Sequence, residues 1–272
     1  MKQFLSLVDQ FFFSPVSLKE AAVLRILTAI LVVVSLLYGD ENLWSTPFPK
    51  ELYSAVFLTW WYKALIILCA CVFGLGWKPR IFGLLLFFLF LPYAFMASLR
   101  QSRQVLLIVV LAMTFIPQFK LWRWFKQEGD GAVQNCPIWP IRLVQIQLSL
   151  LYGVNAVYKT SWSYLSGEVN AELSRAPNFL VDLSSGSFAF GEMMIPLSWV
   201  SIATVVTEYF LAIGFWCRRL ALAVMAVGLL FHYGLTFVIS IGMLDYISIF
   251  LYLFFILPRL EWCKTPKVSL SK

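Results

Sequence analysis

The sequence predicts an all-α fold, a polytopic integral membrane protein built as a bundle of about eight transmembrane helices. Of its 272 residues, 61% are hydrophobic and 13% are charged, whereas soluble domains are about 45–50% apolar and about 25% charged. The apolar residues form blocks of about 18–23 residues, enough to cross a hydrocarbon core about 30 Å thick. Lys and Arg lie between these blocks, so the net charge of +7 indicates contact with membrane lipid and not with nucleic acid.

The blocks define the expected elements in chain order. Residues 1–20 contain three consecutive phenylalanines and predict a short helix lying in the membrane interface. No small-residue cleavage site follows the first apolar run, which is therefore expected to be a retained helix and not a signal peptide. A single domain is expected over residues 1–272, with crossings at 21–39, 54–77, 80–98, 104–119, 137–158, 195–216, 219–240 and 241–258.

The distribution of basic residues predicts the orientation of this bundle. Short loops that carry Lys and Arg stay in the cytoplasm, which places both the N-terminus and the C-terminus there. The polar connection at residues 160–194 then becomes an extracytoplasmic loop segment. Arg100 and Arg103 fall on the outer side against this rule, so either the count of crossings is wrong or these side chains are held there for a reason.

Several ionisable residues converge on the predicted outer side, where such groups tend to mark functional cavities. They are Lys159, His232, Asp245 and the two arginines. Each has a structural alternative: a lysine at a helix end is often an interfacial anchor, and a lone histidine often makes an interhelical hydrogen bond. Glu208, in the middle of the sixth crossing, is expected to be protonated or paired with a polar group.

Other chemistry is not indicated by the sequence. The five cysteines have no zinc-like or redox spacing, and a single histidine makes a histidine-based metal site improbable, so no metal is expected. Hydrolase, metalloprotease and nucleotide-binding motifs are not found. The residues alone therefore predict a membrane protein with an outward-facing polar pocket.

Three stretches together resemble the HTTM family, the transmembrane module shared with vitamin K-dependent gamma-carboxylases. LYGVNAVYKTSWSYLSG is similar to the carboxylase segment of tyrosine, small residues, lysine, tryptophan and glycine, with Lys159 at the second lysine of the family's pair and Tyr158 at the first. FHYGLTFVISIGMLDY is similar to the family's FH…SIGMF-aromatic pattern, and AAVLRIL carries Arg25 like the arginine that often starts the module. The length is also similar to that of small bacterial members, such as the membrane protein that matures a sporulation-delaying toxin.

The resemblance implies a role for Lys159 and a cofactor. In the carboxylases the corresponding lysine is regarded as the base that deprotonates a reduced quinone, and desolvation makes a neutral lysine amine accessible near pH 7. The chain departs from the carboxylases at SLRQSRQ, where Ser102 and arginines replace a family histidine, and it lacks the large luminal domain. Full glutamate carboxylase activity is therefore not expected, and a reduced quinone is implied by the resemblance alone.

The leading hypothesis is a bacterial inner-membrane HTTM protein that modifies or matures a secreted peptide or a lipid-like substrate. Lys159 and His232 are the expected catalytic residues, and a substrate is expected to bind to Arg100, Arg103, Tyr152, Asn155, Trp162 and Asp245. The alternative is a non-catalytic membrane scaffold or accessory subunit for peptide-toxin maturation, export or immunity, which binds another subunit through residues 160–194. A transporter is not favoured, because no pair of broken helices recurs in two halves.

Overall fold

The computed structural model describes residues 2–37, 59–95, 101–118, 135–175, 180–181, 183–190, 193–217, 219–238 and 243–260. The chain divides into two compact units. Unit 1 comprises residues 1–145 and 256–272, and unit 2 comprises residues 146–255.

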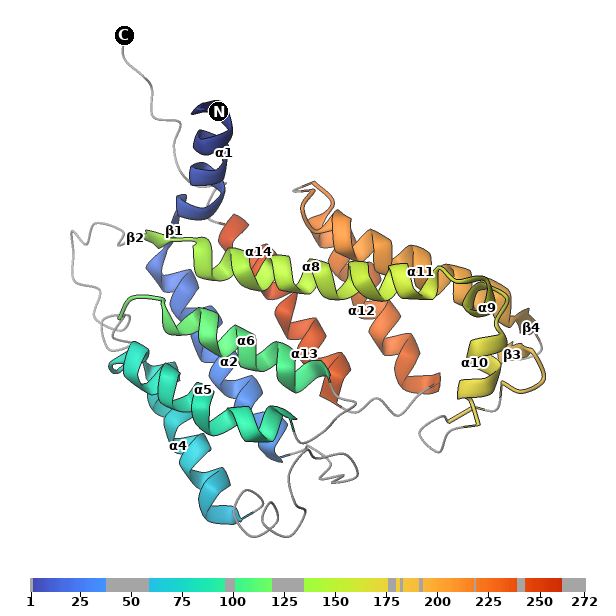
Figure 1. Ribbon diagram of the computed structural model, residues 1–272, viewed down its shortest axis with the longest axis horizontal. Helices are drawn as coiled ribbons and strands as arrows, with labels where there is room; N and C mark the ends of the chain where they lie inside the picture. Colours follow the sequence, from blue (N-terminus) through green and yellow to red (C-terminus); the bar gives the residue numbers. More distant parts are fainter. Residues whose placement is uncertain are drawn as a thin grey trace. The chain divides into compact units, whose positions relative to one another are not determined.

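Four apolar helices form the centre of unit 1 (Figure 1). Helix α2 packs against α4 and α6, and α5 packs against both α4 and α6. Close approach depends on glycines: an added Cβ at Gly83 of α5 would lie 2.3 Å from the Thr114 hydroxyl oxygen. The core between the helices contains fully buried Leu24, Phe73 and Phe90. The four helices are α2 (Leu18–Leu37), α4 (Trp60–Leu75), α5 (Pro79–Phe95) and α6 (Gln101–Thr114).

Helix α5 contains a proline and is tied to a neighbouring helix close to it. Pro92 lies inside α5, so the helix lacks the N–H group that would normally bond to the carbonyl of Phe88, four residues earlier. The carbonyl of the next residue, Leu89, accepts a hydrogen bond of 2.5 Å from the hydroxyl of Tyr62 on α4. A side chain from α4 therefore holds the turn of α5 that precedes the proline.

The N-terminal part of unit 1 is tied to the start of helix α8 (Trp139–Lys159). Helix α1 (Lys2–Phe13) is followed by strand β1 (Pro15–Ser17), which pairs antiparallel with β2 (Asn135–Pro137). The guanidinium of Arg142 lies 4.7 Å from the centre of the Phe11 ring, and its Nε donates to the Phe11 carbonyl. The helix expected within residues 1–20 is therefore present, and its C-terminal end is held by a cation–π contact.

Unit 2 contains most of α8 and the helices that pack with it. Helices α11 (Leu197–Gly214) and α12 (Ala221–Val238) are antiparallel neighbours joined by a short connection. The last helical stretch is interrupted at Tyr252, between α13 (Met243–Leu251) and α14 (Leu253–Leu260). The smaller elements are α9 (Trp162–Leu165), α10 (Glu168–Leu173), and the antiparallel pair of β3 (Ser187–Phe190) and β4 (Met193–Pro196).

The predominantly helical fold agrees with the all-α prediction, with two short strand pairs in addition. Within the described residues, every segment expected to cross the membrane contains an α-helix, and the expected loop at 160–194 contains α9, α10 and most of the β3–β4 pair. Among the described residues, three helices are long and apolar enough to cross a membrane: α2, α11 and α12. The count of eight crossings stays a prediction.

Candidate functional site

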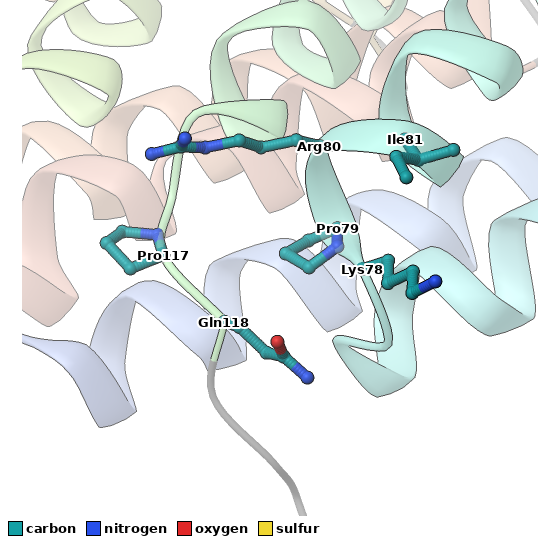
Figure 2. Close-up of a pocket in the computed structure, with 6 residues that line it drawn as sticks. All are labelled: Lys78, Pro79, Arg80, Ile81, Pro117 and Gln118. Atoms are coloured by element: carbon teal, nitrogen blue, oxygen red, sulfur yellow. The ribbon is translucent and has the colours of Figure 1, made fainter.

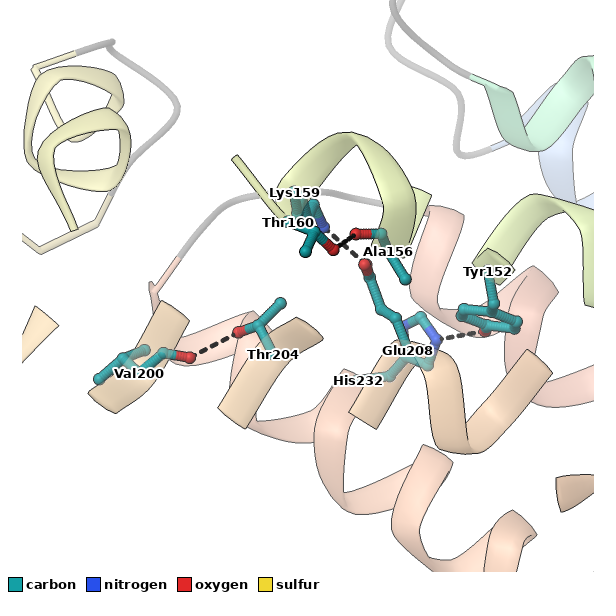
Figure 3. A network of polar contacts seen from close by, with 8 residues as sticks. All are labelled: Tyr152, Ala156, Lys159, Thr160, Val200, Thr204, Glu208 and His232. Carbon is teal, nitrogen blue, oxygen red and sulfur yellow. Dashed lines mark hydrogen bonds and ion pairs between the residues drawn. The ribbon is translucent and has the colours of Figure 1, made fainter. Parts of the chain in front are cut away.

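Lys159 forms an ion pair with Glu208 inside unit 2. Lys159 is the last residue of α8, and its Nζ lies 2.6 Å from Oε1 of Glu208 on α11 (Figure 3). The Lys159 side chain is 32% exposed, whereas the Glu208 side chain is only 5% exposed. The lysine therefore links a buried carboxylate to the surface of the unit.

The second carboxylate oxygen of Glu208 has an unusual environment. Oε2 is buried and makes no hydrogen bond to the described residues. A buried polar atom without a partner costs free energy, and more so when it carries charge. This oxygen is a hydrogen-bond acceptor that a ligand hydroxyl would satisfy, if the partly exposed Lys159 side chain moved aside to admit it.

A chain of three aromatic polar groups lies beside this ion pair. The Tyr152 hydroxyl lies 2.8 Å from Nε2 of His232 and 2.6 Å from the Tyr252 hydroxyl. All three side chains are buried, and His232 is close enough to Glu208 for their charges to interact. A hydroxyl can both donate and accept a hydrogen bond, so a proton can shift along this chain in either direction.

The tyrosine at the end of the chain is held by close packing. Tyr252 occupies the break between α13 and α14, and its ring lies 4.8 Å from the Phe215 ring, centre to centre. Gly228 of α12 faces the Tyr252 side chain, and a Cβ at that position would lie 2.7–2.8 Å from the ring and its hydroxyl. Only glycine leaves room for the phenol at this place.

The structure brings three of the predicted site residues into one region of unit 2. Lys159, His232 and Tyr152 belong to the arrangement shown in Figure 3. Asn155 is half-buried on α8, but Trp162 is 82% exposed. The contribution of Trp162 to an enclosed pocket stays a prediction.

The remaining predicted residues belong to unit 1 or lie outside the described part of the chain. Arg103 belongs to unit 1, where it is buried with its guanidinium 4.3 Å from the centre of the Tyr93 ring. Arg100 lies outside the described residues, as does the side chain of Asp245. The proposed binding role of these three residues is therefore not supported by a described contact with Lys159.

Two functional candidates were missed by sequence reasoning. Glu208 was expected to be protonated or paired with a polar group, but its partner Lys159 could not be read from a separation of 49 residues. Tyr252 carried no signal at all, because it is one of 11 tyrosines in a chain with 25 phenylalanines. Only the three-dimensional packing of α12 against α13 singles it out.

These features define a helical protein whose described residues include three helices long and apolar enough to span a membrane, with a buried polar network next to a lysine–glutamate pair. In the part of the chain that the structure describes, no three His, Cys, Asp or Glu side chains are grouped as metal ligands would be. Comparison with known proteins finds no matching family model, curated protein or solved structure.

Proposed function

We propose that this chain is an HTTM-like protein of the bacterial inner membrane that modifies or matures a secreted peptide or a lipid-like substrate by removing a proton from it. The observation that carries the proposal is the Lys159–Glu208 pair, with a buried carboxylate on one side and a partly exposed amine on the other. Lys159 is also the residue that the resemblance to the family selects. Eight crossings, with both termini in the cytoplasm, complete the proposal.

The pair supplies a base by internal proton transfer. When the Lys159 ammonium gives one proton to Glu208, a neutral amine and a neutral carboxylic acid result, and no net charge has to enter or leave the site. The amine can then accept a proton from a substrate, which leaves an ammonium ion beside the substrate anion. The same ammonium stabilises that anion electrostatically.

The chain of Tyr152, His232 and Tyr252 supports this step by taking up or returning a proton. Because His232 lies near Glu208, a proton that reaches the histidine changes the charge that the carboxylate experiences. A histidine is suited to this task, since one ring nitrogen of a neutral imidazole accepts a proton while the other carries one. The Tyr152 hydroxyl fixes the position of Nε2 by hydrogen bonding, and the Tyr252 hydroxyl in turn bonds to that of Tyr152.

A reduced quinone fits the residues present. Its hydroxyl is a donor for Oε2 of Glu208, which lacks a partner among the described residues, and Lys159 would hold the same group from the exposed side. When bound, the quinone would supply an acidic hydroxyl group. A hydroxylated lipid or a peptide side chain with an acidic proton would meet the same two groups.

The proposal is tested by identifying what copurifies with the protein. The wild type, Lys159→Met and a control, Tyr158→Phe, are purified in mild detergent, and their organic extracts are analysed by mass spectrometry. Tyr158 is exposed on the same helix turn, so its change controls for local effects. We expect a quinone or another hydroxylated lipid, or a peptide, with the wild type and the control but not with Lys159→Met.

The folding of the variant is monitored by size-exclusion chromatography and helical circular dichroism. The double variant Lys159→Met with Glu208→Gln removes the buried charge as well, and it serves as the folded reference if the single variant is unstable. Equal ligand content in wild type and the folded lysine variant would refute the role of Lys159. Extracts that contain only bulk phospholipid would instead favour a non-catalytic scaffold or accessory subunit for a secreted peptide precursor.

A further inference from the structure

Unit 1 contains a pocket that the proposed reaction does not use. It has a volume of about 360 Å³ and lies between the start of α5 and the segment that follows α6 (Figure 2). The residues that line it come from two stretches of the chain: Lys78, Pro79, Arg80, Ile81, Pro117 and Gln118. Two of these six residues are cationic, one is an amide and none is acidic.

The cations are available to a ligand. Lys78 and Arg80 are both exposed, and Figure 2 shows the Arg80 side chain extending past Pro117 while Lys78 points away from it. Two backbone N–H groups at the start of α5, those of Ile81 and Phe82, already donate to the Lys78 carbonyl. The proposed binding of an anion therefore depends on the two cationic side chains.

An apolar stripe leads away from the pocket along α5. Ile81, Leu84, Leu85 and Phe88 are all exposed, and their spacing puts them on one face of the helix. At the pocket end of this stripe, the exposed Trp77 stacks on Phe82 with ring centres 5.3 Å apart. Tryptophan at such a boundary is typical of the level of lipid headgroups.

We propose that the pocket binds the phosphate headgroup of an anionic phospholipid whose acyl chains lie along the α5 stripe. A cationic pocket joined to an exposed apolar stripe matches a ligand with an anionic head and apolar tails. Basic pockets between membrane helices are known to hold such headgroups. This site lies entirely in unit 1, and the proposal does not depend on the chemistry at Lys159.

The experiment compares lipid binding by native mass spectrometry of the detergent-solubilised full chain. The probes are dioleoyl phosphatidylglycerol and dioleoyl phosphatidylcholine, and soluble glycerol 3-phosphate serves as a competitor. The test variant is Lys78→Asn with Arg80→Gln, because Lys78 has a φ of 41° and asparagine tolerates that region. The control, Lys19→Gln with Arg219→Gln, removes the same charge from two other exposed positions.

We expect the wild type and the control to prefer phosphatidylglycerol, and the test variant to bind it about thirtyfold more weakly, about fivefold for each basic side chain. Higher salt should weaken the preference, since exposed charges are screened. Equal binding of both lipids by the wild type, or unchanged binding by a folded test variant, would overturn the proposal. Displacement of the lipid by equimolar glycerol 3-phosphate would also overturn it, because the site would then take a free phosphate.

Discussion

Replacing Lys159 by methionine leaves the Glu208 carboxylate buried without its opposite charge. The lysine stem is retained in length, so the change removes the ammonium group with little loss of packing. Replacing Glu208 by glutamine removes the other charge and keeps the shape of the side chain. The two substitutions, made singly and together, measure how strongly the two groups depend on each other.

The expected magnitude follows from the burial of each partner. Removing one member of a fully buried ion pair costs about 3–5 kcal/mol, whereas an exposed pair contributes about 0–1 kcal/mol. Since the Lys159 side chain is 32% exposed and that of Glu208 is 5% exposed, we expect about 2 kcal/mol for Lys159→Met. Glu208→Gln leaves the more exposed partner behind and should cost about 1 kcal/mol.

The double variant should lose about 1 kcal/mol, because it has no uncompensated charge and retains only the buried amide of the glutamine. The sum of the single effects would then exceed the double effect by about 2 kcal/mol. The free energy of unfolding is measured by titration with sodium dodecyl sulfate in mixed micelles, and Tyr158→Phe serves as an exposed control. Strictly additive effects would refute the reasoning, because they would mean that the two groups do not interact.

Three further results are expected. Gly228→Ala should destabilise the protein by about 1–3 kcal/mol in the same titration, because the added methyl group collides with the Tyr252 ring; an unchanged midpoint would contradict this packing. Tyr252→Phe removes one of the two partners of the Tyr152 hydroxyl and should lower the stability by about 1 kcal/mol, whereas an increase would show that the bond is unfavourable. Cys136 lies outside the apolar helices, and burial raises the pKa of its thiol from 9.0 to about 11. At about pH 8 Cys136 should therefore react with maleimide at least about a hundredfold more slowly than the exposed Cys217, and its rate should rise as the pH approaches the raised pKa. Equal rates for the two cysteines would exclude this burial.

The helices were predictable because hydrophobicity alone marks them. Each apolar block expected between residues 21 and 258 contains a helix where the chain is described, since a segment of that length in lipid must satisfy its own backbone hydrogen bonds. The break at Tyr252 was not foreseen. The Tyr252 phenol at this break lies against Gly228, and the hydrophobicity of the segment does not reveal that contact.

The candidate site was only partly predictable. Lys159 and His232 were selected because ionisable groups in apolar surroundings are rare and conspicuous. The partners of these residues could not be predicted, because the Lys159–Glu208 pair joins positions that are distant in the chain. Trp162 was selected because it follows the lysine closely in the sequence; its side chain is 82% exposed, and its role as a pocket wall stays a prediction.

The Tyr62 hydrogen bond to the Leu89 carbonyl has a mechanical consequence for α5. A proline inside a helix usually kinks it, because the ring clashes with the carbonyl four residues earlier. Here the turn before Pro92 is bonded to α4 through the Leu89 carbonyl. The apolar stripe, which ends at Phe88, therefore lies on the part of α5 that α4 holds in place.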